Sequence, residues 1–407
     1  MKQTTKPLAE VAEFRLGKML DEKKNKGEPL PYLANINVRW GEFDLENLRE
    51  MRFEHDEMDR YGLKYGDIVM CEGGEPGRCA IWKESVPGMM IQKALHRIRP
   101  HDCIDHRFLF YSFLHKGRIG TFAPLFTGAT IKHLPREKLA KVEIALPSLD
   151  VQRRIADILS AYDDLIENNR RRMALLEEAA RLLYREWFVR LRFPGHEHTR
   201  LIIGMPEGWR KIPLGEVTTK IGSGSTPRGG EAAYLAEGIT LIRSLNVYDD
   251  QFDDDGLAFI SDDQAAALAG VTVEPRDILL NITGASVARC CMAPGRYLPA
   301  RVNQHVMIIR VDPEKLDPFF VHAAINSDER KRQLLSYAQK GSTREALTKE
   351  MMARFEIALP ADTLMRRFGE IAEASFQQRE NLAMQNRRLR AARDLLLPRL
   401  MSGEIAV

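Results

Sequence analysis

The sequence predicts a mixed α/β (α+β) protein built from two copies of one unit, each a sheet-containing globular domain followed by a long helix. Two observations predict this fold class. The chain matches itself at a spacing near 210 residues, and each copy ends in a heptad pattern of apolar residues. The length of 407 residues agrees with two to three domains at roughly 150 residues each. With 44% apolar and 29% charged residues, the composition argues against a wholly disordered or collagen-like chain.

Composition also narrows the class of protein. No apolar run reaches the roughly 18 residues that a membrane helix needs, and the first ten residues are polar, so we expect neither a membrane span nor secretion. The five cysteines form no C-x-x-C pair, which favours reduced thiols and a cytoplasmic protein. The net charge of +3 does not by itself indicate a nucleic-acid partner, so a DNA-binding face would depend on local sorting of charge.

The internal repeat is clearest where Glu143–Pro147 and Glu356–Pro360 carry the same five residues. The offset between matching segments rises gradually along the chain, as expected when one copy has gained a few residues in its loops. A period this long excludes a solenoid and indicates a duplicated domain. The further matches pair Pro7–Val11 with Pro213–Val217, Asn37–Val38 with Asn246–Val247, Gly66–Val69 with Arg276–Leu279, Asp105 and Phe108 with Asp317 and Phe320, and Arg153–Arg154 with Arg366–Arg367.

The first part of each copy reads as a globular domain, and we place these domains at residues 1–147 and 193–360. Short strand-like runs, such as Asp277–Leu280 and Val306–Ile309, alternate with Gly, Pro, Asn and Asp. This punctuation is typical of an α/β or mostly β unit.

The first long helix is predicted within residues 148–192. Ser148 is a suitable N-cap and Asp150 lies in the first turn. From Asp150 to Arg190 the helix would be about 60 Å long, and its seam needs a partner. Asn169 on this seam is either a register-setting polar contact or a slightly exposed position near a kink. The seam comprises Ile155, Leu159, Tyr162, Ile166, Asn169, Met173, Leu176, Ala180, Leu183 and Trp187.

The second long helix is predicted within residues 361–407, which also include a C-terminal tail. Asp362 is its expected N-cap, and Leu382, Leu389 and Leu396 recur every seven residues. We expect the helix to end near Pro398, because proline strains a helix interior. The economical assembly pairs the two helices as an antiparallel coiled coil with an approximate two-fold axis inside one chain.

The chain resembles the specificity subunits of type I restriction-modification systems, over nearly its whole length. The duplication carries this resemblance together with several motifs. The chain departs from the family pattern at two places. The first domain lacks the Gly-Trp pair that opens the second domain, and the second helix has Met365-Arg366 where the first has Gln152-Arg153. These departures bear only on the domain boundaries and on partner docking. The motifs are Leu-Pro-x-x-x-x-Gln-Arg-Arg-Ile-Ala at 146–156, Asp-Asp-Leu-Ile-Glu-Asn-Asn at 163–169, Trp187-Phe188, Gly208-Trp209 with Leu214-Gly215-Glu216, and the closing segment 396–405.

The resemblance implies a specificity module that is not itself an enzyme. Each globular domain would read one half of a split, asymmetric site on double-stranded DNA. The paired helices would set the unread spacer and dock two methylation subunits, and restriction (translocase) subunits would join this core. Adenine methylation and ATP-dependent cleavage would belong to the partners, and so would S-adenosylmethionine, ATP and Mg. We therefore expect no cofactor, metal or catalytic residue in this chain.

The motifs that the chain lacks agree with a non-catalytic role. There is no G-x-x-x-x-G-K-[ST] phosphate loop and no G-x-S-x-G elbow. Asp317-Pro318-Phe319-Phe320 lacks the second proline of amino-methylating enzymes, and we expect a loop that leads into a buried helix. The acidic run at 249–255 lacks the spacing of a calcium loop, and we expect a solvated loop. Two alternatives stay open: a helical scaffold that reads no DNA, and a self-sufficient methyltransferase or nuclease.

The expected DNA readers are basic, amide and hydroxyl side chains on Gly- and Ser-containing loops, where bare backbone can approach phosphate. Three stretches fit: 222–230, 340–344 with its counterpart 127–132, and 283–289 with its counterpart around Arg78. A surface turn is the alternative for each. The candidates are Arg78, Gly128, Thr130, Lys132, Thr226, Arg228, Arg243, Arg289, Gln304, Lys340, Ser342, Thr343 and Arg344.

Overall fold

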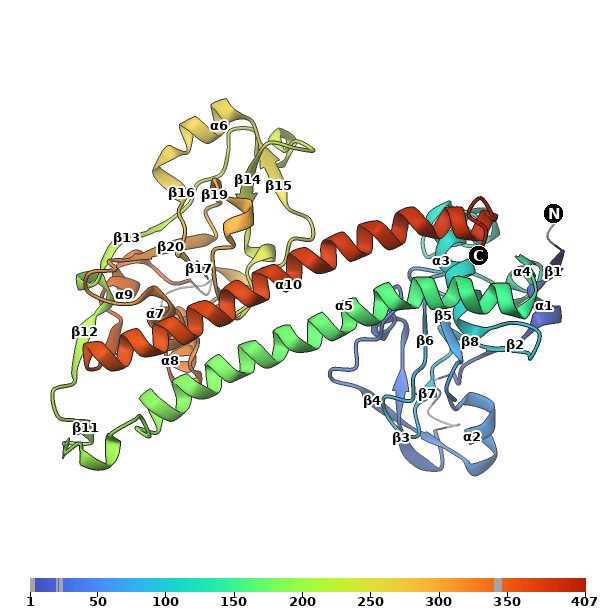
Figure 1. The fold of residues 1–407 in the computed structure, drawn as a ribbon, viewed down its shortest axis with the longest axis horizontal. Coiled ribbons are helices and arrows are strands. Elements are labelled where there is room, and N and C mark those ends of the chain that lie inside the picture. Colours follow the sequence, from blue (N-terminus) through green and yellow to red (C-terminus); the bar gives the residue numbers. More distant parts are fainter. Residues whose placement is uncertain (1–3, 20, 22–24, 340–345) are drawn as a thin grey trace. The chain divides into compact units, whose positions relative to one another are not determined.

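The computed structural model describes residues 4–19, 21, 25–339 and 346–407 (Figure 1). The chain forms two compact units, one of residues 1–168 with 385–407 and the other of residues 169–384. None of the helices in the described ranges is long and apolar enough to cross a membrane.

The first unit contains two main sheets and a short strand pair. One sheet is antiparallel in the order β2-β8-β5-β6. In the other, β3 lies between β4, which is antiparallel to it, and β7, which is parallel. Strand β1 pairs with β9, which brings the two ends of the domain together. The bounds are β1 (Thr5–Pro7), β2 (Ala12–Leu16), β3 (Glu28–Leu33), β4 (Arg49–Phe53), β5 (Ile68–Cys71), β6 (Cys79–Ile81), β7 (Met90–Ile91), β8 (Leu95–Pro100), β9 (Glu143–Ala145), α1 (Leu8–Val11), α2 (His55–Tyr61), α3 (His106–Arg118) and α4 (Arg136–Leu139).

Helix α3 anchors the core of this unit. The Asp105 side chain caps the helix by accepting hydrogen bonds from the backbone N–H groups of Arg107 and Phe108. Every residue from Phe108 to Leu114 is buried, so α3 is apolar nearly all round and packs on several sides.

The second unit repeats this topology. Its four-stranded sheet has the order β13-β20-β17-β18, and β14 lies between an antiparallel β15 and a parallel β19. Strand β12 pairs with β21 as β1 pairs with β9. The predicted duplication and fold class are therefore confirmed. The bounds are β10 (Leu201–Ile202), β11 (Met205–Pro206), β12 (Arg210–Pro213), β13 (Thr218–Ser223), β14 (Ile239–Ile242), β15 (Ala258–Ile260), β16 (Thr272–Val273), β17 (Ile278–Asn281), β18 (Cys290–Met292), β19 (Ala300–Val302), β20 (Val306–Val311), β21 (Glu356–Leu359), α6 (Asp262–Ala267), α7 (Pro318–Asn326), α8 (Asp328–Gln339) and α9 (Lys349–Ala353).

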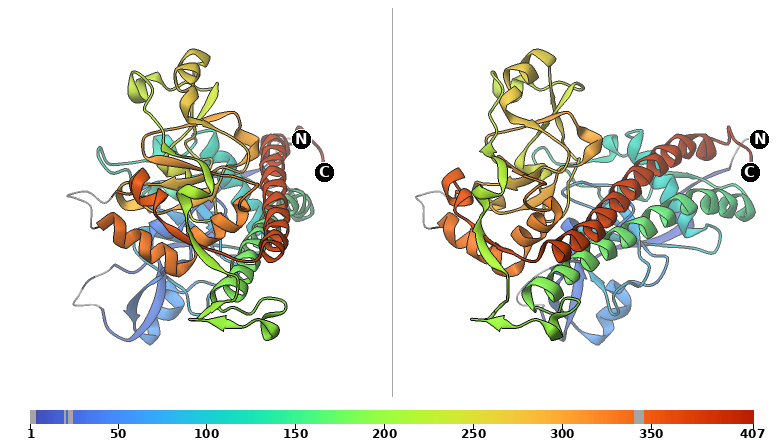
Figure 2. Two further views of the ribbon diagram at one scale, coloured as in Figure 1. Left: turned by 90° about the vertical axis from the view of Figure 1, so that its left-hand side faces the viewer. Right: turned by 60° about the vertical axis from the view of Figure 1, so that its left-hand side comes forward.

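Two long helices follow the sheet regions, α5 (Leu149–Tyr184) and α10 (Asp362–Ser402). In the first unit the start of α5 lies beside the end of α10 (Figures 1 and 2). There Ile155 and Leu159 share a core with Leu397 and Leu400. The Nδ2 atom of Asn386, earlier on α10, donates to the carbonyl of Ile166, later on α5, at 3.4 Å. The helices therefore run antiparallel in this unit, as predicted.

The second unit shows the same antiparallel relationship between the end of α5 and the start of α10. Arg379 Nη2 lies 2.8 Å from Glu177 Oε2, and the Tyr184 ring lies 5.7 Å from the Phe368 ring. After Tyr184 the helix changes to a π-helical turn, Arg185–Val189, which buries Trp187 and Phe188.

The predicted seam residues all lie away from open solvent. On α5, Ile155, Leu159, Ile166, Asn169 and Trp187 are buried and Met173, Leu176 and Leu183 are half-buried. On α10, Leu382 is buried, and Leu389 and Leu396 are half-buried. Asn169 and Asn386 are both buried, which favours the polar-contact reading of Asn169 over an exposed kink.

The predicted helix end near Pro398 is wrong, because α10 continues to Ser402 with Pro398 inside it. Proline removes one backbone donor from the helix. The residues around it, Leu397, Leu400 and Met401, are buried in the core of the first unit. Burial of this apolar face compensates for the lost hydrogen bond.

Candidate nucleic-acid interface

In the first unit three loops meet beside the edge of the β5–β6 pair. They are the 3₁₀ turn Asn35–Asn37 after β3, the turn 72–78 between β5 and β6, and the loop 127–133. Gly73 bridges to His133, and Asn35 Nδ2 donates to the Gly73 carbonyl at 3.4 Å. The structure thus brings together the loops that carry Arg78, Gly128, Thr130 and Lys132.

The two ends of the loop 127–133 are hydrogen-bonded to each other, and the residues between them are exposed to solvent. Thr127 and His133 exchange backbone hydrogen bonds of 2.9 and 2.8 Å, and His133 Nδ1 lies 3.0 Å from Glu72 Oε2. Gly128 has φ +92°, and a Cβ there would lie 2.1 Å from the Ile131 carbonyl oxygen, so only glycine fits. Thr130 and Lys132 are exposed between these anchors, as contact with a large partner requires.

Arg78 is placed differently from the exposed loop candidates. Its side chain is only 11% exposed and lies 2.8 Å from Glu75, and Nη2 donates to the Asn35 carbonyl at 3.0 Å. The guanidinium therefore joins two of the three loops, which fits a positioning role better than a base contact.

In the second unit a chain of polar contacts connects several candidates. Thr226 donates a hydrogen bond to Gln304, and Gln304 Nε2 lies 3.0 Å from His305 Nε2. The other ring nitrogen of His305 lies 2.7 Å from Thr283 Oγ1. Thr283 in turn bridges to Ala346. Lys340, Ser342, Thr343 and Arg344 lie outside the described residues.

The three arginine candidates of the second unit differ in how far their guanidinium groups are already bound within the protein. Arg228 is exposed. The guanidinium of Arg289 lies 4.6 Å from the centre of the Tyr248 ring, which fixes its orientation while its edge can still donate. Arg243 is largely engaged, because it donates to the Gly256 carbonyl at 2.6 Å and its side chain is 19% exposed.

Sequence reasoning missed two features of these loops. His305 joins Gln304 to Thr283, and the turns that contain Asn35 and Ser244 lie beside the predicted readers. The Asn37–Val38 match with Asn246–Val247 was the available signal for these turns, since asparagine favours turns and here recurs at the same place in both copies.

The acidic and proline-aromatic motifs have structural roles. Asp317 caps α7 by accepting from the N–H groups of Phe319 and Phe320, both buried, so the expected loop leading into a buried helix is confirmed. Burial raises the pKa of Asp317, although these two N–H bonds oppose that shift. In the acidic run only part is solvated as expected: Asp255 is exposed, but Asp253 and Asp254 are half-buried, and Asp254 accepts a hydrogen bond from Tyr297.

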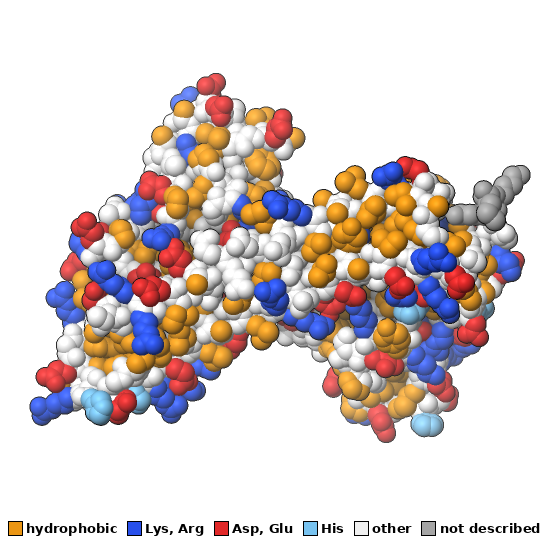
Figure 3. All heavy atoms as spheres, in the orientation of Figure 1, with side chains coloured by type: hydrophobic (Ala, Val, Ile, Leu, Met, Phe, Trp, Pro, Cys, Tyr) orange, Lys and Arg blue, Asp and Glu red, His pale blue; other side chains and the backbone are white. Residues whose placement is uncertain are grey.

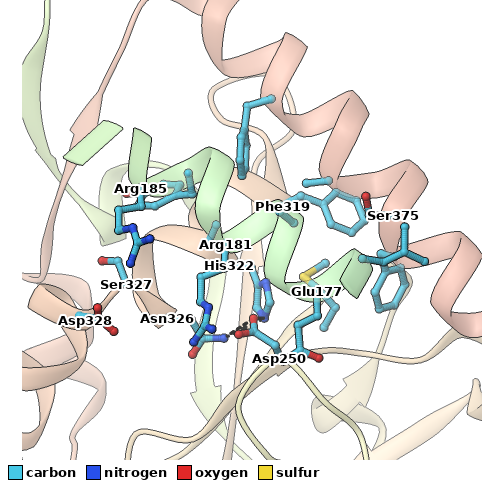
Figure 4. Close-up of a pocket in the computed structure, with 18 of the residues that line it drawn as sticks. Glu177, Arg181, Arg185, Asp250, Phe319, His322, Asn326, Ser327, Asp328 and Ser375 are labelled. Atoms are coloured by element: carbon cyan, nitrogen blue, oxygen red, sulfur yellow. Dashed lines mark hydrogen bonds and ion pairs between the residues drawn. The ribbon is translucent and has the colours of Figure 1, made fainter. Parts of the chain in front are cut away.

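The second unit also contains a cavity of about 340 Å³ among α5, α7, α8 and α10. Asn326 Nδ2 donates to Asp250 Oδ1 at 2.8 Å, and His322 Nε2 lies 3.5 Å from the same oxygen; these three side chains converge in Figure 4. Burial lowers the pKa of His322.

The repeat pairs His322 with Phe110, which packs beside Gly41 in the first unit. Ala323 likewise corresponds to the buried Tyr111, so smaller side chains open this cavity in the second copy.

Comparison with known proteins identifies relatives over most of the chain. Residues 2–178 match the family described as "Type I restriction modification DNA specificity domain". The type I restriction enzyme MjaIX specificity subunit of Methanocaldococcus jannaschii is 26% identical over 356 residues, covering 84% of this chain and 78% of the relative. The putative MjaX specificity subunit of the same organism is 23% identical over 405 residues, covering 95% and 90%. The crystal structure of the S subunit from M. genitalium superimposes with a TM-score of 0.59 at 15% identity, covering 98% of this chain and 96% of that one, and agrees in fold.

Proposed function

We propose that the chain is a specificity subunit of a type I restriction-modification system, as its similarity to the family and relatives above supports, and that it selects the DNA sequence on which a type I complex acts. The observation that carries this proposal is the repeated convergence of hydroxyl-, amide- and arginine-bearing loops, in one globular domain and again in the other. Each domain reads one half of a bipartite site, and two different loop sets make that site asymmetric.

The long helices set the spacer and dock the methylation subunits. A solvated helix pair seldom needs large apolar side chains on its outer face. In the first unit Ile158, Leu165 and Leu395 are 37%, 50% and 73% exposed, and apolar side chains gather over the end of α10 in Figure 3. In the second unit Leu175 and Ile371 are 69% and 42% exposed. These side chains supply apolar area that a helical partner can bury.

Catalysis is assigned to the partner subunits. Adenine methylation with S-adenosylmethionine, and ATP- and Mg-dependent translocation and cleavage, require sites that we do not assign to this chain. The loop residues described above are suited to binding: hydroxyls, amides and arginines donate to phosphates and base edges.

The deciding measurement is the adenine methylome of the source cells with and without the gene. Loss of methylation at one split motif on deletion, restored by the wild-type gene, is the expected result. In the complemented strain, exchange of residues 1–147 for those of a relative should change one half of the motif and leave the other half unchanged. The half of the motif that stays unchanged in this strain is the internal control, because it is assigned to the second domain.

Two results would contradict the proposal. A methylome that does not change on deletion, in cells shown to express the complex, would favour a scaffold without DNA reading. Methyl transfer by the purified chain without partners would favour a self-sufficient enzyme.

Binding of the purified complex to DNA should weaken steeply as the salt concentration rises, because each phosphate contact releases counterions from the DNA.

A further inference from the structure

We propose that Ile36 and Leu245 are specificity-determining residues, each contacting the methyl group of a thymine in the half-site read by its own domain. The inference rests on the proposed function. It assigns an apolar base contact to two positions that are not among the polar residues predicted from the sequence to contact DNA.

Both residues occupy the same place in the repeat. Each is the middle residue of a 3₁₀ turn, Asn35–Asn37 after β3 in one domain and Ser244–Asn246 after β14 in the other. Ile36 is 53% exposed and Leu245 is 42% exposed. One exposed aliphatic side chain is ordinary, but a large aliphatic residue at the same turn tip in both copies is what a tip that packs against a partner needs.

Both turns are held rigidly by a buried asparagine. Asn37 Oδ1 accepts from the Ala34 N–H at 2.9 Å, and its Nδ2 donates to the Asp44 carbonyl at 3.0 Å. Asn246 makes the matching bonds, of 3.0 Å each, with Arg243 N–H and the Asp253 carbonyl. A braced tip holds its side chain in place before a partner arrives, which lowers the entropy cost of the contact.

The turns lie against the loops that carry the candidate readers. In the first domain Arg78 Nη2 donates to the Asn35 carbonyl, and Asn35 contacts Gly73. In the second, Asn281 Nδ2 donates to the Ser244 carbonyl at 2.8 Å, directly before the turn that carries Thr283. DNA that touches those loops therefore passes close to the apolar tips.

The chemistry of the side chain selects the ligand group. Ile and Leu can neither donate nor accept a hydrogen bond, so they cannot bind phosphate or the polar edge of a base. The C5-methyl of thymine is the apolar group that the major groove presents. An aliphatic tip packed on this methyl distinguishes T·A from the other base pairs.

The test uses the purified complex with its methylation subunits and DNA duplexes carrying the motif from the methylome. Each thymine of the motif is replaced in turn by deoxyuridine, which removes only the methyl group. For the wild-type complex, one replacement in each half should weaken binding about three- to fivefold, as expected for one buried methyl group. In an Ile36→Ala complex this sensitivity should disappear from the first half and persist in the second. Leu245→Ala should give the reverse.

Matched variants separate this contact from general damage. Ile119→Ala and Ile203→Ala remove other exposed aliphatic side chains, 63% and 101% exposed, and should leave both sensitivities intact. The proposal is overturned if no deoxyuridine weakens wild-type binding by more than twofold, if either half of the motif lacks a T·A pair, or if either alanine variant keeps the sensitivity of its own half. Loss of complex assembly by the tip variants, measured by gel filtration, would instead make the tips a subunit contact and overturn it too. None of these outcomes alters the deletion result that tests the proposed function.

Discussion

Arg310 binds the fully buried carboxylate of Asp277 through two hydrogen bonds of 2.8 Å, from Nε and Nη2. The same carboxylate accepts from the Glu274 N–H at 2.7 Å. The hydrogen bonds to Asp277 are the main reason that the pKa of Arg310 is raised. In the first domain Arg99 binds Asp67 in the same way, with two bonds of 2.7 Å. This pair ties the turn before the central strand to the neighbouring strand in both copies.

Replacing Asp277 by Asn should destabilise the second domain. The substitution removes the buried carboxylate that binds the Arg310 guanidinium and leaves only the half-exposed Glu274, and breaking a buried pair costs about 3 kcal/mol. Because the Arg310 side chain is 22% exposed, we expect the free energy of unfolding, measured in urea, to fall by that amount or slightly less. Asp67→Asn is the matched variant for the first domain. Glu274→Gln, which removes a half-exposed partner of Arg310, should change the free energy of unfolding by less than about 1 kcal/mol. An equal loss of stability in the Glu274 variant would show that burial of the Asp277 carboxylate adds nothing to the strength of its pair with Arg310.

The stability of the first domain should fall as the pH drops below His96's ordinary pKa of 6.5. His96 is fully buried, with Nε2 2.9 Å from the Leu134 carbonyl, and burial lowers its pKa. The unfolded chain therefore binds a proton at a pH where the folded chain does not, so acid favours unfolding. The free energy of unfolding, measured between pH 8 and 5, should decline less steeply for His96→Gln than for the wild type. Identical slopes would exclude this histidine as a source of acid sensitivity.

Filling the cavity of the second unit should stabilise it. Ala323 lines the cavity and corresponds to Tyr111, whose ring is buried in the first unit. Ala323→Leu should add about 0.5–1 kcal/mol to the free energy of unfolding, as cavity-filling changes commonly do. Ala338→Leu is the control, because Ala338 is fully buried within the packed core, where added volume costs about 1–3 kcal/mol. Destabilisation by both variants would mean that the cavity cannot accept a side chain in this conformation.

The sequence predicted the fold far better than it predicted the loops. The repeated segment at 143–147 was enough to predict the duplicated domain, because a copied unit keeps its sequence. Heptad spacing was enough to predict the paired helices, because that pattern records periodic burial. The continuation of α10 through Pro398 depends on tertiary packing of Leu400, which local propensity does not contain. The same holds for the engagement of Arg243 and Arg78, since Gly256 and Asn35, whose carbonyls accept their hydrogen bonds, are distant in sequence.

Replacing Gly128 by Ala should impair reading of one half of the DNA site. At φ +92° a Cβ would lie 2.1 Å from the Ile131 carbonyl oxygen, so the tip that carries Thr130 and Lys132 must change shape. Methylome sequencing should show weakened or relaxed recognition in the half assigned to the first domain, with the other half unchanged. Gly120→Ala is the matched control: its φ of +75° carries similar backbone strain, but nothing lies within 4 Å of its Cβ, so it should cost stability without changing specificity. Equal effects of the two variants on the methylome would trace the change to lost stability and would remove loop 127–133 from the reading surface.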